Sequence, residues 1–436
     1  MLLQNQHGID QESMYFIVLM TAAMLFVPLG GIFGVFLWGR MADRYGRKCT
    51  ILISNVISVV SAAMMCSDAI FRQFEFNLFT RFFVGVGSGT FTYSVPLYIL
   101  EISPLNLRGV FVTSSILFYS WGHFAVQILG HPQVWGNKES YTLLTGITAM
   151  SSVLSSILLV YSPESPRFLY LQRNDEDKAR QVLMKLRGEE DVEEEMEELR
   201  QEQLAESDQE NMTVWKLLHF RSLRWHLITL MVLVSGSQFV ETSAVLIFTK
   251  RSLRIIGMSS KARDLLILAV SLVIQLMLLT NICLVEPLGR KFLLLSGFLM
   301  CSLTNICLVF SFQTNNPTVA FLSIILSILY FMGHITGPAS ILPLIVGELF
   351  LQSSRASAYV LAGLISWGTN LVLSIMLLLT SSFLGSYYLL LYWPFIAFTY
   401  IYILRVLPET SGKTFEEIQG NMLAHTSKSS RKITAE

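Results

Sequence analysis

Long apolar stretches dominate the sequence and constrain its fold more than any other feature. Eleven segments of roughly 20 residues carry few charged side chains, five before the long polar stretch in mid-chain and six after it. A helix of about 20 residues spans a hydrocarbon core about 30 Å thick. The predicted spans are 14–38, 49–66, 76–100, 110–129, 141–161, 225–249, 265–285, 292–312, 319–346, 359–380 and 387–407. The pattern predicts an all-α, polytopic membrane protein.

Composition and charge exclude several other classes of protein. Of 436 residues, 53% are hydrophobic and 14% charged, which is too apolar for a soluble domain of this length. The formal net charge of zero argues against nucleic acid as a partner. The segment before the first span has no basic region followed by a short apolar one, so we expect no cleavable signal peptide. The five cysteines lack ligand-like spacing, and no nucleophile or nucleotide loop is evident, so we expect no metal, cofactor or enzymatic activity.

Basic residues in the short loops predict the orientation in the membrane. Those that share one side are Arg40, Arg44, Arg47, Lys48, Arg290, Lys291 and Arg355. Cytoplasmic loops carry the excess of Lys and Arg, so this side is predicted to be cytoplasmic, together with the central polar stretch and the tail. An odd number of spans then puts Met1 outside and Glu436 inside. The basic cluster in 250–263 falls on the opposite side and disagrees. The sequon at Asn211 falls in the cytoplasmic stretch, where we expect no glycan.

Three acidic positions recur in order in the two halves of the chain. Asp43 in DRYGRK corresponds to Glu286 in EPLGRK, and Glu164 in PESPR corresponds to Glu409 in PETSGKT. Between them lie Glu101 and Glu348, each followed seven residues later by an arginine. The acids are separated by 58 and 63 residues in the first half and by 62 and 61 in the second. This spacing predicts two homologous bundles.

These repeated charges are predicted to lie at cytoplasmic helix ends, where they could form ion pairs that break when the bundles move. We call them the gating charges. They are Asp43, Arg47, Glu101, Arg108, Glu164, Arg167, Glu286, Arg290, Glu348, Arg355 and Glu409. The alternative is that loop charges only fix topology and solubility. The repeat favours the gating interpretation.

The motifs resemble those of a known family. GRMADRYGRK fills every position of the major facilitator superfamily signature G-x-x-x-D-R-x-G-R-[RK], and PESPR and PETSGKT resemble sugar-porter signatures. The segments LRGEEDVEEEMEELRQE, RSLRW and ELFLQSSR are most similar to the fructose branch of the facilitative glucose transporters. The resemblance implies two helical bundles around a midplane cavity, transport of a hexose, and a plasma-membrane location.

The same resemblance implies a domain division. The expected parts are an N-terminal bundle (1–164), a cytoplasmic helical linker (165–222), a C-terminal bundle of six helices (223–407) and a cytoplasmic tail (408–436). The family has twelve spans, so the first helix has no counterpart among the five predicted spans of the first bundle. We expect that lack to make the chain as given a poor hexose transporter.

Five residues are the predicted substrate site. By resemblance, Gln127 and Gln238 match glutamines that ligate the hexose in relatives, and His334 matches a histidine characteristic of the fructose branch. Trp367 and Asn370 match the W-x-x-N of the family's eleventh helix. Amides, imidazoles and indoles can replace the hydration of a sugar in a low-dielectric cavity. The alternative is that such residues only bond a neighbouring helix.

Several positions depart from the family pattern and leave the substrate open. Apolar or small residues replace polar contacts of the family. They are Ser237, Ser243, Leu246, Ile247, Phe248, Ile274, with Gln275 adjacent, Ala339 and Ser366. Glu241 is an acid inside a span and allows a proton-coupled mechanism, or is simply protonated or paired there. A diverged or truncated paralogue that carries no hexose is a further alternative. We favour uniport of a hexose, with fructose preferred to glucose as the substrate.

Overall fold

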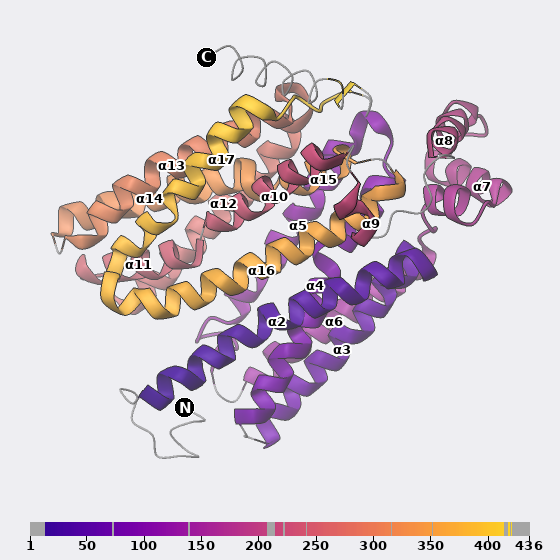
Figure 1. Ribbon diagram of the computed structural model, residues 1–436. Helices are drawn as coiled ribbons and strands as arrows, with labels where there is room; N and C mark the ends of the chain where they lie inside the picture. The colour runs from indigo at the N-terminus through magenta and orange to yellow at the C-terminus, as the bar shows by residue number, and fades with distance from the viewer. Residues whose placement is uncertain are drawn as a thin grey trace, which may run out of the picture. The chain divides into compact units, whose positions relative to one another are not determined.

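The computed structural model describes residues 14–71, 74–137, 140–206, 214–220, 223–240, 242–314, 316–350, 352–413, 417–418 and 420 (Figure 1). Within these ranges the chain is helical and contains no β-strand. Eleven helices found among the described residues are long and apolar enough to cross a membrane. The prediction of an all-α membrane protein with about eleven spans is therefore confirmed. Glu241, the Asn211 sequon and both chain ends lie outside the described residues.

The chain forms two compact units. Unit 1 comprises Met1–Ser103, Leu129–Leu218 and Gln352–Ile375, and unit 2 comprises Pro104–Ile128, His219–Leu351 and Met376–Glu436. One helix of the first sequence half therefore packs in unit 2, and part of one helix of the second half packs in unit 1. These units follow contacts rather than the sequence repeat, so the four-part domain division remains a prediction.

Unit 1 contains four complete spans, the linker and part of a fifth span. Its helices are α2 (Met14–Tyr45), α3 (Arg47–Phe71), α4 (Phe74–Ile102), α6 (Tyr141–Tyr161), α7 (Glu176–Arg187), α8 (Glu193–Glu206), most of α9 (Val214–His219) and the first part of α16 (Gln352–Leu384). A π-helical turn, Phe168–Gln172, precedes α7. The helices α7, α8 and α9 fall within the predicted linker, whose assignment as a separate domain stays a prediction.

Glycines bring α2 and α4 close together. A Cβ added to Gly30 or Gly34 of α2 would strike the backbone carbonyl oxygens of Phe82 or Val86 on α4. In the reverse direction, a Cβ on Gly85 of α4 would strike the carbonyl of Val27. Small residues at these positions let two membrane helices approach until their backbones touch. The sequence GVGSG thus serves helix packing.

The apolar face of α6 is left uncovered within the protein. Met150, Leu154 and Leu158 follow one another at helical spacing and are exposed by 67%, 57% and 62%. In a soluble protein such a stripe would be buried, but the hydrocarbon of a bilayer solvates it. This face is the kind of surface that lies against lipid.

Unit 2 contains the remaining spans. Its helices are α5 (Arg108–Leu129), α10 (Arg224–Phe239), α11 (Thr242–Ile255), α12 (Ser260–Leu288), α13 (Arg290–Gln313), α14 (Pro317–His334), α15 (Leu342–Glu348), the end of α16 and α17 (Trp393–Val406). Within this unit α13 packs against α14 and α17, and α11 packs against α14. The 3₁₀ segment η1 (Leu105–Leu107) leads into α5, and η5 (Gly385–Leu391) leads towards α17.

Two predicted spans are interrupted. The span predicted at 225–249 is divided into α10 and α11, and Val240 stands between α10 and the undescribed Glu241. The span predicted at 319–346 changes from α14 to a π-helical segment, Ile335–Ala339, before α15. Pro338 explains the second change, because proline has no N–H to continue an α-helical hydrogen-bond pattern.

Candidate functional site

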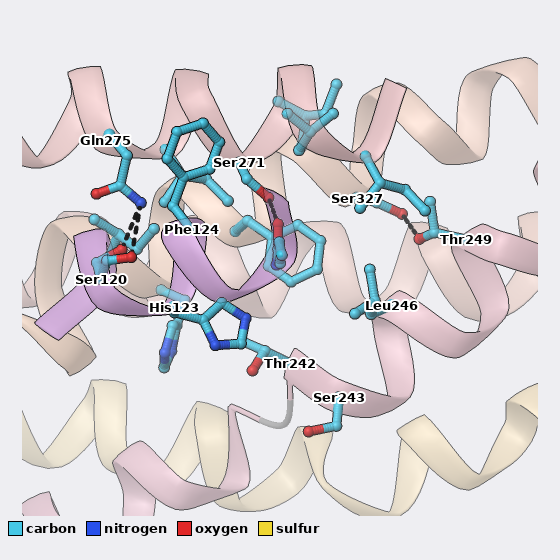
Figure 2. Close-up of a pocket in the computed structure, with 18 of the residues that line it drawn as sticks. Ser120, His123, Phe124, Thr242, Ser243, Leu246, Thr249, Ser271, Gln275 and Ser327 are labelled. Atoms are coloured by element: carbon cyan, nitrogen blue, oxygen red, sulfur yellow. Dashed lines mark hydrogen bonds between the residues drawn. The ribbon is translucent and has the colours of Figure 1, made fainter. Parts of the chain in front are cut away.

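Unit 2 encloses a cavity of about 630 Å³ that is lined by α5, α11, α12, α14 and the π-helical segment (Figure 2). Such a volume is within the range of small-molecule sites. Most of the wall is apolar, and no charged side chain is among the described residues that line it. The polar lining residues are Tyr119, Ser120, His123, Gln127, Thr242, Ser243, Thr249, Ser271, Gln275, Ser327 and His334.

Two hydrogen-bonded pairs join α5 to α12 at the cavity wall. Ser271 Oγ donates to Gln127 Oε1 at 2.6 Å. Gln275 Nε2 donates to Ser120 Oγ at 2.7 Å and to the Ser120 carbonyl oxygen at 3.3 Å (Figure 2). Both glutamines are therefore held by hydrogen bonds between helices.

Hydroxyl groups join α11 to α14 on another wall. Thr249 Oγ1 lies 2.7 Å from Ser327 Oγ (Figure 2). Outside the lining, Ser323 Oγ donates to Ser252 Oγ at 2.9 Å. Ser252, Ser323 and Thr249 are buried, and the hydroxyls of Ser323 and Thr249 also lie within hydrogen-bond distance of a carbonyl oxygen of their own helix. This wall is held together by its own polar groups.

His334 ends α14 and lines the cavity just before the π-helical segment. Its Nδ1 is buried and has no hydrogen-bond partner among the described residues. The widened turn after it is stabilised by Asn281 Nδ2, which donates to the Thr336 carbonyl oxygen at 3.2 Å and to Ser340 Oγ at 2.6 Å. Asn281 thereby occupies an acceptor that the irregular helix leaves available.

The structure brings two of the five predicted substrate residues into this cavity. Gln127 and His334 line it, whereas Gln238 does not. Gln238 is half-buried on α10, and its Nε2 lies 3.5 Å from Ser237 Oγ. Trp367 and Asn370 belong to the part of α16 in unit 1. There the Trp367 indole packs over Gly31 of α2. Substrate contact by any of the five remains a prediction.

Five positions that depart from the family pattern line the cavity, although none of them is among the predicted site residues. Ser243, Leu246, Ile247, Ile274 and Ala339, all flagged as departures from the family pattern, line the cavity. The hydrogen-bonded residues Ser120, Ser271 and Gln275 were missed as a group. The signal available for them was the recurrence of polar residues along one face of each helix, which indicates a face that meets another helix.

Three gating charges of the first half, Arg47, Glu101 and Glu164, form one network in unit 1. Arg47 Nε lies 3.1 Å from Glu101 Oε2, and both side chains are almost fully buried. The backbone N–H groups of Arg47 and Lys48 donate to Glu164 Oε1 at 3.0 and 3.1 Å. Burial raises the pKa of the Glu164 carboxyl, and hydrogen bonds from the backbone of Ser165 and Lys48 oppose this effect.

The second half repeats this network in unit 2. Arg290 Nη2 lies 3.2 Å from Glu348 Oε1, and its Nη1 lies 2.7 Å from Glu286 Oε2. The backbone N–H groups of Arg290 and Lys291 donate to Glu409 at 2.9 and 3.1 Å. The sequence repeat is thus realised as a repeat of contacts. One arginine side chain and one helix N-terminus hold two acids in unit 1 and three acids in unit 2.

A glycine precedes each of these helix N-termini and allows the approach of the acid. Gly46 and Gly289 have φ angles of +95° and +81°, in the region that favours glycine. A Cβ on Gly46 would lie 2.5 Å from Glu164 Oε2, and one on Gly289 would lie 2.6 Å from Glu409 Oε2. The glycine in each G-R-K motif is therefore required by both backbone conformation and space.

The remaining gating charges have separate surroundings. Arg167 is buried and lies 3.5 Å from Glu198 of α8, and both residues belong to the predicted linker. Arg108, at the start of α5, interacts electrostatically with Glu348. Asp43 is exposed at the end of α2, and Arg355 is buried near the start of α16. Their predicted gating role is tested by none of these contacts.

Comparison with known proteins identifies the family. Residues 3–421 match the family model described as "Sugar (and other) transporter". The chain is 33% identical over 418 residues to "Solute carrier family 2, facilitated glucose transporter member 7" of Homo sapiens, covering 95% of this chain and 81% of that protein. It is 34% identical over 417 residues to member 5 of the same family from Mus musculus, covering 95% and 83%.

A solved structure supports the same fold. The proton:xylose symporter XylE bound to 6-bromo-6-deoxy-D-glucose matches with a TM-score of 0.81 and 20% sequence identity, covering 96% of this chain and 93% of that one. At this identity the match establishes the major facilitator fold alone. Together with the family match over nearly the whole sequence, it confirms the resemblance inferred from the motifs. The chain belongs to the sugar-transporter family and is a multi-pass membrane transporter rather than an enzyme.

Proposed function

We propose that this protein carries a hexose across the membrane by facilitated diffusion and alternating access. Family membership supports transport of a sugar, and the two relatives above are named as facilitated glucose transporters. The substrate proposed here is a neutral hexose, with fructose preferred to glucose. No cofactor is needed, because facilitated diffusion follows the concentration gradient of the sugar.

The observation that carries this proposal is the uncharged cavity of unit 2. It presents the amides of Gln127 and Gln275, the imidazole of His334 and several serine and threonine hydroxyls among a mostly apolar lining. A sugar has many hydroxyls, each able to donate and accept a hydrogen bond, and such groups match these side chains. An ion would instead call for charged partners in a low-dielectric site.

His334 supports the preference for fructose. By resemblance, it matches a histidine that is characteristic of the fructose branch. Its buried Nδ1 has no hydrogen-bond partner among the described residues. An unpaired polar atom at the wall of a cavity is available to a ligand hydroxyl. We therefore propose Gln127 and His334, with Gln238, Trp367 and Asn370, as the substrate-binding residues.

We further propose that the gating charges control access to the cavity from the cytoplasm. The clearest support is that some of them join the two sequence halves within unit 2. The backbone N–H of Gly109 on α5 donates to Glu286 Oε1 of α12 at 3.0 Å, and Arg108 interacts with Glu348. Contacts of this kind must change if the sequence halves move apart during alternating access.

The proposed setting is the plasma membrane, with the tail and linker in the cytoplasm. The basic residues of the gating motifs support this orientation through the positive-inside rule. The four-part division at 164, 222 and 407 is proposed to describe the evolutionary bundles and their linker, whereas the two compact units describe contacts in one conformation.

Uptake into proteoliposomes tests the proposed function. The purified chain should take up labelled fructose, and to a smaller extent glucose, with saturation and without dependence on a pH gradient. Empty liposomes and a non-transported sugar such as L-glucose provide the controls. Uptake that requires a pH gradient, and loses this requirement in Glu241→Gln, would indicate proton coupling instead. No saturable uptake of any hexose would overturn the proposal.

A further inference from the structure

Three hydrogen-bonded contacts join α5 and α12 along their length. Gly109 pairs with Glu286, Ser120 with Gln275, and Gln127 with Ser271. We call these six residues the α5–α12 ladder. All six lie in unit 2, although α5 comes from the first sequence half and α12 from the second. The order of the partners is reversed on the two helices, so the helices run antiparallel.

The spacing shows that the ladder occupies one face of each helix. Its residues are 11 and 7 positions apart on α5 and 4 and 11 positions apart on α12. At 3.6 residues per turn these intervals correspond to about three, two, one and three turns. Between the outer contact and the two cavity contacts lies an apolar layer of Leu117, Leu278 and Ile335. The ladder is thus polar at one end and at the cavity, with packed apolar side chains between.

The cavity contacts leave hydrogen-bonding capacity unused. Gln275 is only 2% exposed, and its amide nitrogen must face Ser120, because the backbone carbonyl of Ser120 can only accept a hydrogen bond. Gln275 Oε1 is consequently turned away from Ser120, and it has no partner among the described residues. A buried acceptor without a partner makes this arrangement less stable than one in which both ends of the amide are paired.

In Gln127 the oxygen of the amide, rather than the nitrogen, is bonded to a serine. Its Oε1 accepts the hydrogen bond of Ser271, so its amide nitrogen is the group left for another partner. Both glutamines line the cavity. Each glutamine thus uses one end of its amide to bond a serine of the opposing helix.

We propose that Gln275 is a further substrate-contacting residue, and that hydroxyls of the sugar replace Ser120 and Ser271 as partners of the two glutamines. This inference rests on the proposed function. Each sugar hydroxyl can donate and accept, so it can pair with either end of an amide that has been released. Substrate binding then opens the cavity part of the α5–α12 ladder and leaves the Gly109–Glu286 contact in place. Loosening of α5 from α12 is thereby linked to occupancy of the site.

We call this replacement of the serine partners by sugar hydroxyls the exchange. It predicts opposite effects on fructose affinity for substitutions of the serines and of Gln275. Removing the Ser271 hydroxyl abolishes a bond that the sugar must break, so Ser271→Ala should bind fructose about two- to tenfold more tightly. Ser120→Ala should tighten binding less, because the Ser120 carbonyl still accepts from Gln275. Gln275→Leu should weaken binding about tenfold. If the serines only positioned the glutamines, Ser271→Ala would weaken binding instead.

The experiment measures equilibrium binding of fructose to the purified full chain by isothermal calorimetry, for the wild type and each variant. Ser115→Ala is the matched control, because Ser115 lies on α5, bonds only the Val112 carbonyl oxygen among the contacts described, and is not a lining residue. Thermal melting establishes that each variant is folded. The double variant Gln127→Leu/Ser271→Ala completes a cycle: Ser271→Ala should have no tightening effect once Gln127 is absent.

The outcomes separate this inference from the function on which it rests. Tighter binding by Ser271→Ala with weaker binding by Gln275→Leu supports the exchange. Fructose binding that is unchanged in Gln275→Leu, or weakened or unchanged in Ser271→Ala, overturns the exchange and leaves hexose transport standing. A wild-type chain that binds and transports none of the hexoses overturns both.

Discussion

Glu409 accepts a hydrogen bond of 2.9 Å from the backbone N–H of Arg290, the first residue of α13. Glu164 accepts one of 3.0 Å from Arg47, the first residue of α3. The first N–H groups of a helix have no partner within the helix, and a negative charge at this end is favourable. These two repeated acids therefore cap helices inside their own units.

The caps predict a stability loss on truncation. Glu164→Ala and Glu409→Ala should each lower the free energy of unfolding by about 1–2 kcal/mol, the range for loss of a helix N-cap. Glu190→Ala, in an exposed turn of the linker, is the matched control and should leave stability unchanged. Thermal melting in detergent makes the comparison. Equal melting temperatures for all three variants would show that the caps contribute nothing.

The close approach of α2 and α4 yields a second prediction. Gly85→Ala places a methyl group against the Val27 carbonyl oxygen, so the helices must separate. Overpacking of this kind destabilises by about 1–3 kcal/mol. Gly146→Ala on α6 adds the same methyl group where no atom lies within 4 Å, and it should be neutral or slightly stabilising. If Gly85→Ala melts no lower than Gly146→Ala, the packing role of the glycines is wrong.

The spans and the charge repeat could be predicted because both are local in sequence. The span predicted at 141–161 matches α6 residue for residue, and the G-R-K motifs begin α3 and α13. Most other helices extend a few residues beyond the prediction, for example α12 from Ser260 to Leu288, because a helix continues into the interface after its apolar stretch ends.

Other features depend on which helices become neighbours and could not be read from one segment. The Ser120–Gln275 bond requires that α5 packs against α12, and these helices lie in different sequence halves. The π-helical segment around Pro338 requires a donor from Asn281, which is distant in sequence. Hydropathy also gave no sign that the predicted span 225–249 would be divided, because both α10 and α11 are largely apolar.

Arg187 joins α7 and α8 to the end of α4, and this contact yields a third prediction. Its guanidinium donates to both oxygens of Glu195 at 2.6 and 2.8 Å and to the Ile102 carbonyl oxygen, near the end of α4, at 3.1 Å. Lysine cannot reproduce this planar, bidentate arrangement. Arg187→Lys should therefore increase amide hydrogen exchange in α7 and α8. Arg180→Lys, whose partner Glu193 is more exposed, is the control and should leave exchange unchanged.

The contact between Gly109 and Glu286 yields a fourth prediction. Glu286→Ala removes an acceptor that joins the sequence halves, so it should change the ratio of inward- to outward-open protein about two- to tenfold. The intrinsic affinity for sugar should remain the same. Glu101→Gln and Arg355→Ala are also predicted to change the ratio of inward- to outward-open protein. A single cysteine at Ile116, in a chain lacking the native cysteines, reports accessibility from each side to an impermeant thiol reagent. Unchanged labelling from both sides would contradict the gate.

The substrate site yields the last prediction. Gln127→Ala and His334→Ala should each weaken fructose binding roughly tenfold, because both side chains line the cavity. The melting temperature should stay near that of the wild type, because polar cavity residues contribute mainly to ligand contacts. Gln238 is the informative comparison, since it matches the family pattern but is not among the cavity's lining residues. The sequence-based assignment requires that Gln238→Ala also weakens binding. An effect confined to Gln127 and His334 would restrict the site to the cavity of unit 2, and unchanged binding in all three variants would remove the assignment altogether.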